Sequence, residues 1–262
     1  MDYKTIKTEI ADNICCITLD NPASLNALSE LNVQELIHAL DKIEADNFVR
    51  VVLITGSGKV FCAGGDISEM AEYSAEQGRA ISRSVNTIYK KIENSKKVYI
   101  AVVNGHALGG GCELALSCDI CIASEKAKFA LPEVTLGILP GGGGTQRLGR
   151  LVGIKKAMEI ILTGDRIEAH EAMRIGIVNQ VLPGEDLLTY AREMAGRIIK
   201  NAPRAVHYAK ECIRQCEEMT LEAGLEYENT MFGLCFTTSD QKEGMKAFLE
   251  KRPIIYPADF VD

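Results

Sequence analysis

The spacing of apolar and polar positions divides the chain into two parts. In the first two-thirds, runs rich in β-branched residues predict buried strands at residues 14–19, 49–55, 98–103 and 119–124. Between these runs, apolar side chains recur at helical spacing and predict helices at residues 31–43, 81–92 and 110–117. Strands that alternate with helices in this order predict right-handed βαβ-type connections and a largely parallel sheet, which is an α/β fold.

The pattern changes near residue 185. Helical segments follow without a strand between them, at residues 185–200, 203–217, 220–236 and 239–250. Pro203 fits the first turn of one of these helices, where the missing N–H would be unpaired in any case. We therefore predict a catalytic core at residues 1–184 and a separate helical region at residues 185–262.

Composition and charge narrow the classes of function. Of the 262 residues, 47% are apolar and 25% are charged, which is ordinary for a globular protein. No apolar run approaches the roughly 18 residues that cross a bilayer. The net charge of −7 argues against bulk attraction to nucleic acid or to an anionic membrane. Residues 1–7 are polar and charged without an apolar centre, so we expect no signal peptide and a cytoplasmic location.

Motifs for metal, redox and nucleotide chemistry are incomplete. Cys118 and Cys121 form a C-x-x-C, but no second pair accompanies them, and we expect the nine cysteines to be reduced thiols. His170 and Glu171 do not continue to H-E-x-x-H, and no G-x-G-x-x-G or G-x-S-x-G is completed. We therefore predict no metal site, no dinucleotide site and no serine nucleophile.

Segments rich in small residues remain as candidates for chemistry, at residues 61–67, 104–114 and 131–147. Without bulky side chains, backbone N–H groups in such segments can approach a ligand oxygen directly. Two donors that converge on one carbonyl form an oxyanion hole, and each contributes roughly 2.7–4 kcal/mol of transition-state stabilisation. The alternative is that the glycines only permit tight turns or close helix–strand packing.

Glu113 and Glu133 lie within the second and third of these segments. Taken singly, Glu113 fits a favourable position in the first turn of a helix, and Glu133 fits an ordinary position at a rim. A pair of carboxylates that faces one oxyanion hole would instead supply a proton donor and an activator of water to a polarised carbonyl. The spacing in the sequence does not decide whether the two side chains converge.

The same segments resemble the signature regions of the crotonase (enoyl-CoA hydratase/isomerase) superfamily. They contain the motifs F-C-A-G-G-D-I, N-G-x-A-L-G-G-G-C-E-L-A and P-E-V-x-L-G-I-x-P-G-G-G-G-T-Q-R-L, and the resemblance extends from about residue 14 to Arg252. It implies a spiral of ββα turns and a C-terminal helical region that forms trimers, usually stacked into a hexamer. It also implies an acyl-CoA thioester substrate and no cofactor, because coenzyme A is part of the substrate.

The resemblance implies roles for individual residues. The backbone N–H groups of Ala63 and Gly110 would bind the thioester oxygen. Glu113 and Glu133 would hold the water that adds across the C2=C3 bond of a trans-2-enoyl-CoA, such as crotonyl-CoA, to give the 3-hydroxyacyl-CoA. The usual assignment makes Glu113 the base toward water and Glu133 the acid toward C2.

Contacts to the rest of coenzyme A are implied for Ala23, Leu25, Asp66 and Ile67. Many members of the superfamily have basic residues near the first two of these positions, whereas Asn21 and Ser24 are neutral here. We therefore expect Lys59, or Lys251 from a neighbouring subunit, to hold the phosphates of coenzyme A. Phe248 is a further expected contact.

Other functions stay open at this point. Enoyl-CoA isomerases often need one acidic residue, so the presence of both glutamates favours hydration, while decarboxylases and hydrolases share the fold. Some relatives bind RNA, which requires a basic stripe on the surface. The strongest basic cluster, residues 90–91 with residues 96–97, is short and lies in an acidic chain. We therefore predict no nucleic-acid partner and no membrane partner.

Overall fold

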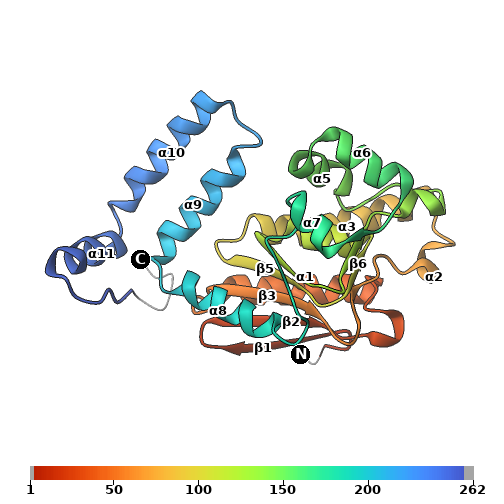
Figure 1. The fold of residues 1–262 in the computed structure, drawn as a ribbon, viewed down its shortest axis with the longest axis horizontal. Coiled ribbons are helices and arrows are strands. Elements are labelled where there is room, and N and C mark those ends of the chain that lie inside the picture. Colours follow the sequence, from red (N-terminus) through yellow and green to blue (C-terminus); the bar gives the residue numbers. More distant parts are fainter. Residues whose placement is uncertain (1–2, 257–262) are drawn as a thin grey trace.

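The computed structural model describes residues 3–256. Residues 1–2 and 257–262 lie outside the described residues, and they include the start of the polar N-terminal segment and the end of the predicted helical region. A core with two sheets and surrounding helices occupies one side of the molecule, and an arm of helices extends from it on the other side (Figure 1).

The larger sheet contains, in spatial order, β1 (Ile6–Ala11), β2 (Ile14–Leu19), β3 (Val51–Gly56), β5 (Val98–Val103), β7 (Ile120–Ser124) and β10 (Gln180–Leu182). β1 and β2 pair antiparallel, and the other neighbouring pairs are parallel. Central parallel strands are covered on both faces, which explains why they appear in the sequence as continuous β-branched runs. The predicted strands at residues 14–19 and 98–103 are confirmed without a change of bounds.

The smaller sheet is built from short strands in the order β4 (Val60–Cys62), β6 (His106–Leu108), β8 (Lys128–Ala130) and β9 (Ile167–Glu168). The first three strands run parallel and β9 runs antiparallel to β8. Each of β4, β6 and β8 follows a strand of the larger sheet along the chain and precedes a helical segment. The predicted α/β fold with repeated ββα turns is therefore confirmed.

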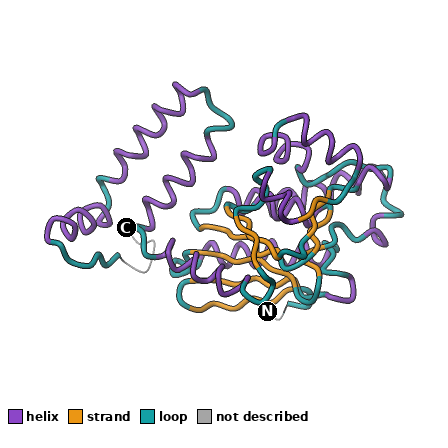
Figure 2. Tube along the Cα trace, viewed as in Figure 1, coloured by secondary structure: helices purple, strands orange, loops and turns teal. Residues whose placement is uncertain are grey.

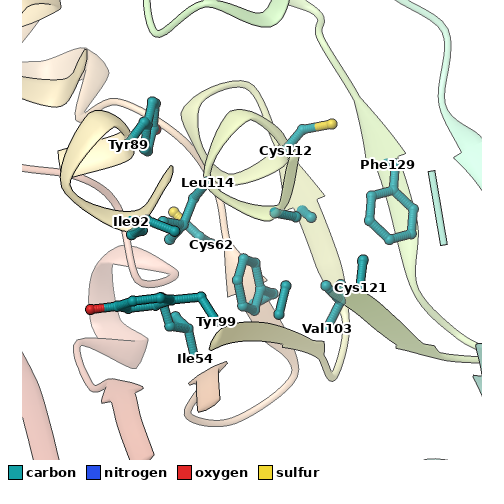
Figure 3. Packing of buried hydrophobic residues seen from close by; sticks show 14 of the residues in the cluster. Ile54, Cys62, Tyr89, Ile92, Tyr99, Val103, Cys112, Leu114, Cys121 and Phe129 are labelled. Atoms are coloured by element: carbon teal, nitrogen blue, oxygen red, sulfur yellow. The ribbon is translucent and has the colours of Figure 1, made fainter. Parts of the chain in front are cut away.

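Helices cover both faces of the larger sheet. On one face, α1 (Glu30–Ala45), α3 (Ala75–Glu93) and α4 (Gly110–Ser117) pack in the main apolar cluster. Figure 3 shows the centre of this cluster, where Tyr99 and Leu114 lie among side chains from both sheets. On the other face, α8 (Leu187–Ile199) packs through Leu187 and Ala191. The core therefore includes the first helix of the region predicted to be separate.

The remaining C-terminal helices, α9 (Pro203–Gln215), α10 (Leu221–Cys235) and α11 (Ser239–Glu250), form the arm (Figures 1 and 2). Lys210 anchors α9, because its ammonium group lies 2.9 Å from Asp119 and donates to the Lys97 carbonyl at 2.7 Å. Along the arm, Leu221 is 81% exposed and Leu249 is 79% exposed. The four predicted C-terminal helices are confirmed, whereas a boundary at residue 184 stays a prediction because α8 packs on the sheet.

In the C-x-x-C pair, Cys118 directly follows α4 and Cys121 lies within β7. Both thiols are free, and burial raises the pKa of Cys118 and brings that of Cys121 to about 12. Within residues 3–256, no three His, Cys, Asp or Glu side chains are grouped so that they could hold a metal ion. In the same residues, no helix is long and apolar enough to cross a membrane.

Candidate active site

Three loops meet at one edge of the smaller sheet. β4, β6 and β8 are parallel neighbours, so the segments after their carboxyl ends emerge side by side. A Cβ atom added to Gly64, after β4, would lie 3.4 Å from the Cα atom of Gly109, after β6. A Cβ atom added to Gly109 would lie 3.0 Å from Oε1 of Glu133, after β8. The three segments that the sequence singled out therefore come together.

Glu113 is held by backbone N–H groups from a distant turn. It lies in the first turn of α4 and is only 2% exposed. Its Oε1 accepts from the N–H groups of Gly142 at 2.8 Å and Gly144 at 2.7 Å, and its Oε2 accepts from Gly142 at 3.0 Å. Burial raises the pKa of Glu113, while these hydrogen bonds and the charge of Arg147 oppose the rise.

The turn that holds Glu113 depends on glycine at two positions. A Cβ atom on Gly142 would lie 2.4 Å from Oε2 of Glu113, so a side chain there would collide with the carboxylate. Gly143 has a φ of +95°, in the left-handed region that other residues rarely adopt. The turn leads into α5 (Gly144–Val152), which the sequence analysis did not predict. At these positions the glycine run permits both a turn and a close approach of backbone to carboxylate.

Glu133 has different surroundings. It begins the short 3₁₀ helix η2 (Glu133–Leu136), directly after Pro132. Its Oε2 is buried and has no hydrogen-bond partner among residues 3–256. Burial is the main cause that raises the pKa of Glu133 to about 7, and the negative charge of Glu113 raises it further. The two carboxylates therefore lie close enough to influence each other's protonation.

One of the two predicted oxyanion donors is available and the other is occupied. Gly110 is the first residue of α4, so its N–H has no partner within the helix. No hydrogen bond joins this N–H to another residue in the described part of the chain. The N–H of Ala63, in contrast, donates to the Leu25 carbonyl at 3.1 Å. The N–H of Ala63 is therefore already paired in this structure, which argues against its predicted role as an oxyanion donor.

The N–H group of Gly65 is a candidate to replace that of Ala63. The carbonyl of Gly64 accepts from the N–H of Leu28 at 2.7 Å. In a trans peptide the C=O and N–H groups point in opposite directions, so the N–H of Gly65 points away from Leu28. The positive φ of Gly64, +94°, turns the chain at this point. Among the residues after β4, Gly65 therefore becomes the candidate donor that accompanies Gly110.

Comparison with known proteins now identifies the family. The family model described as enoyl-CoA hydratase/isomerase matches residues 9–258. This chain belongs to the enoyl-CoA hydratase/isomerase family. It is 45% identical over 255 residues to the short-chain-enoyl-CoA hydratase of Clostridium acetobutylicum, which covers 97% of this chain and 98% of that protein. It is 44% identical to the crotonyl-CoA hydratase of Syntrophomonas wolfei, with coverage of 96% and 97%.

Solved structures agree with the family assignment. The crystal structure of an enoyl-CoA hydratase from Bacillus anthracis superimposes with a TM-score of 0.94 at 41% identity, and the match covers 98% of this chain and 100% of that one. The resemblance inferred from the motifs and the fold that it implied are therefore confirmed. Membership of this family implies that the substrate is an acyl-CoA.

Several of the residues expected to contact coenzyme A line one rim of the site. Ala23 lies in the short helix η1 (Pro22–Ser24), and Leu25, which follows it, is 53% exposed. Asp66 caps α2 (Ile67–Met70) by accepting from the N–H of Ser68 at 3.0 Å, and Ile67 is 49% exposed. Lys59 is exposed in the turn between β3 and β4. The hydrogen bond between Ala63 and Leu25 joins the two halves of this rim.

Phe248 and Lys251 do not reach this rim within one chain. Both lie at the end of α11, on the opposite side of the molecule from α2 (Figure 1). Phe248 is 78% exposed, and Lys251 ends the helix with a φ of +54°. Their predicted contact with coenzyme A therefore requires a neighbouring subunit.

The sequence analysis missed the residues that surround the glycine turn. Tyr89 of α3 donates from its hydroxyl to the Gly110 carbonyl at 2.6 Å. The guanidinium of Arg147 lies 5.4 Å from the centre of the Tyr89 ring and pairs with Glu93. Arg147 stands in the third motif, but its partners come from α3, and no local pattern connects the two helices.

Proposed function

We propose that this chain is an enoyl-CoA hydratase in which Glu113 and Glu133 share the acid–base work. One observation carries the proposal: a buried carboxylate, that of Glu113, and a half-buried one, that of Glu133, lie beside two candidate backbone donors. The reaction adds water across the C2=C3 bond of a trans-2-enoyl-CoA and gives a 3-hydroxyacyl-CoA.

The proposed chemistry follows from these groups. The N–H groups of Gly65 and Gly110 donate hydrogen bonds to the thioester oxygen in an oxyanion hole, which draws electrons toward that oxygen and makes C3 electrophilic. Glu113 removes a proton from water as the water oxygen forms a bond to C3. The electron pair of the double bond moves toward C2 and the thioester, giving an enolate. Glu133 then delivers a proton to C2, which restores the thioester carbonyl.

The different surroundings support this division of labour. A pKa of about 7 for Glu133 leaves much of this carboxyl protonated near neutral pH, as a proton donor to C2 requires. Glu113 accepts N–H groups from Gly142 and Gly144, which favour its ionised form. Each carboxylate oxygen has two acceptor sites, so Glu113 keeps capacity to accept from a water molecule.

We infer a preference for short acyl chains, because the relatives from Clostridium acetobutylicum and Syntrophomonas wolfei are described as short-chain and crotonyl-CoA hydratases. Hydration should be measured against trans-2-enoyl-CoA esters from four carbons upward. We expect kcat/KM to be highest for crotonyl-CoA and lower by roughly tenfold or more for the long esters. If the chain hydrates none of these esters and instead converts a 3-enoyl-CoA, the proposal is wrong and the chain is an isomerase.

We also infer a trimer, or a hexamer of two trimers, in which Phe248 and Lys251 of one subunit reach the coenzyme A bound by another. The exposed apolar side chains along the arm support this assembly. A crystal structure with an unreactive acyl-CoA analogue tests the assembly and the oxyanion hole together.

In that complex, we expect the thioester oxygen about 2.7–3.1 Å from the nitrogens of Gly65 and Gly110. Coenzyme A should lie against Lys59, with Phe248 and Lys251 of a second subunit nearby. A thioester oxygen bound by the N–H of Ala63 would restore the assignment from the sequence. A monomer with a complete coenzyme A site would contradict the role of both α11 residues.

A further inference from the structure

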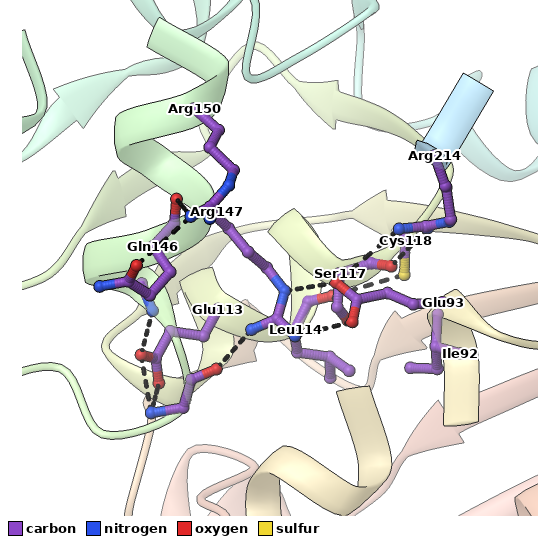
Figure 4. A network of polar contacts seen from close by, with 12 residues as sticks. Ile92, Glu93, Glu113, Leu114, Ser117, Cys118, Gln146, Arg147, Arg150 and Arg214 are labelled. Carbon is purple, nitrogen blue, oxygen red and sulfur yellow. Dashed lines mark hydrogen bonds and ion pairs between the residues drawn. The ribbon is translucent and has the colours of Figure 1, made fainter. Parts of the chain in front are cut away.

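Arg147 joins the turn that holds Glu113 to a separate helix. It lies in α5, and its side chain is 17% exposed. Its Nη1 donates to the Gly142 carbonyl at 2.6 Å, and its Nη2 donates to Oε2 of Glu93, in α3, at 2.8 Å. Its Nε donates to the other oxygen of Glu93, so the pair is bidentate (Figure 4). A fork of this kind fixes both the position and the orientation of the guanidinium.

The contact with Gly142 bears directly on the candidate base. The N–H of Gly142 donates to both oxygens of Glu113, and the carbonyl of the same residue accepts from Arg147. Gly143, the next residue, has a φ of +95°, and a Cβ atom there would lie 2.2 Å from Nη1 of Arg147. A glycine turn has little intrinsic preference for one conformation. The hydrogen bond from Arg147 therefore selects the conformation in which the turn holds Glu113.

Glu93 in turn has a second cationic neighbour. Nη1 of Arg214, in α9, lies 3.7 Å from Oε1 of Glu93, and Nη2 of Arg214 pairs with Asp119 at 2.7 Å. Figure 4 shows the resulting series from Glu113 through Arg147 and Glu93 to Arg214. Ion pairs therefore connect the turn at Glu113 with the first helix of the arm.

We propose that Arg147 is a positioning residue for the hydration reaction, which acts by fixing the Gly142–Gly143 turn and through it the carboxylate of Glu113. The inference rests on the proposed role of Glu113 as the base. Glu93 is the anchor of Arg147, because it accepts two of the hydrogen bonds of the guanidinium. Lysine cannot replace this arrangement fully, since one ammonium group cannot reproduce the planar fork to Glu93 and reach Gly142 as well.

Steady-state kinetics of Arg147→Met and a matched control give the first test. The control is Arg150→Met, on the same helix, where the exposed Arg150 bonds to Gln146 within α5 and lies 4.0 Å from Oε1 of Glu218. We expect Arg147→Met to lower kcat about 10²-fold, the scale of a misplacement of roughly 1 Å at a reacting group. KM should change less than about threefold, because Arg147 touches no substrate-binding group. Arg150→Met should keep both constants within about twofold of the original chain.

A double-mutant cycle separates positioning from general structural damage. In a Glu113→Gln background, Arg147→Met should lower kcat by less than about threefold, because the group that Arg147 positions is already gone. The same 10²-fold loss in both backgrounds would assign Arg147 a purely structural role and overturn the proposal. Absence of hydration by the original chain would instead contradict the proposed function.

Amide hydrogen exchange supplies a readout that needs no turnover. Exchange in the peptide that contains residues 141–144 should be at least about tenfold faster in Arg147→Met than in the original chain and unchanged in Arg150→Met. Unchanged exchange in Arg147→Met would overturn the proposal. If Arg147→Met does not fold, Arg147→Lys and Glu93→Gln replace it. Each should show a smaller loss of kcat together with faster exchange. A normal kcat and a normal exchange rate in these variants would overturn the proposal.

Discussion

The two glutamates of the site have the same side chain and opposite surroundings. Glu113 is wrapped by N–H groups from the Gly142–Gly144 turn, and Arg147 lies behind that turn. Glu133 is half-buried, and its Oε2 has no partner among residues 3–256. Burial raises the pKa of both carboxyls, but hydrogen bonds to a carboxylate favour its ionised form and oppose this rise at Glu113. The difference in hydrogen bonding therefore supports the proposed roles of Glu113 as base and Glu133 as acid.

The surroundings of Glu133 leave its side chain open to a partner from outside the chain. Its Oε2 pairs with nothing in residues 3–256, while Thr135 and Leu136 of the same short helix η2 are exposed. No hydrogen bond of Oε2 within the described chain therefore requires an acidic residue at this position. A substrate or a water molecule can supply the partner, which agrees with the proposed role of Glu133 as proton donor to C2.

The largest expected effect comes from replacing each glutamate by its amide. Glu113→Gln and Glu133→Gln should each lower kcat by at least roughly 10²–10⁴-fold, the range for a positioned acid or base. The double variant should lose less than the product of the two factors, because the residues act as a unit. Steady-state hydration of crotonyl-CoA measures all three. Near-normal turnover by either single variant would remove that residue from the mechanism.

Stability should separate the same two variants. In Glu113→Gln an amide NH₂ group replaces one of the oxygens that accept from Gly142 and Gly144, which should cost about 1–3 kcal/mol. Glu133→Gln breaks no hydrogen bond of Oε2 to the described chain and should leave the unfolding temperature unchanged or higher. Equal destabilisation of both variants would contradict the contrast between wrapped and unpartnered carboxylates.

Much of the fold could be predicted because its periodic signals are strong. The strands β2, β3, β5 and β7 each carry a β-branched run, and the helices of the arm carry an amphipathic repeat, whereas β1 and the three-residue β10 at the two edges of the larger sheet were not predicted. The smaller sheet was not predicted, since its strands contain only two or three residues and show no period. α5 and α6 (Ile154–Thr163) were missed for another reason: they begin directly after glycines and carry no side-chain cap.

The site was predicted in part. Glu113, Glu133 and Gly110 belong to motifs that the fold brings together at one edge of the smaller sheet. The N–H of Ala63 donates to the Leu25 carbonyl instead of staying free for a ligand, and a motif does not specify this contact between distant segments. Arg147 had no predicted role because its partner Glu93 is distant in sequence. Geometry that depends on one long-range hydrogen bond or ion pair could not be obtained from spacing.

The pH dependence should be the smallest effect and the most direct measure of the contrast between the two glutamates. Hydration requires one proton on the pair, held by Glu133, with Glu113 ionised. A raised pKa means that the proton on Glu133 is present below about pH 7 and is lost as the pH rises through that value. We therefore expect kcat/KM to fall about tenfold per pH unit above an apparent pKa near 7. It should also fall on the acid side, when Glu113 becomes protonated.

Dehydration of 3-hydroxybutyryl-CoA provides the control for this profile. The reverse reaction also begins with one proton on the pair, held by Glu113, so the same two apparent pKa values should govern kcat/KM in both directions. Glu133→Gln should lose the basic limb and retain the acid limb, because its amide does not titrate. If the basic limb persists in Glu133→Gln with the same midpoint, another group titrates near pH 7 and the proton on Glu133 is not the one that reaches C2.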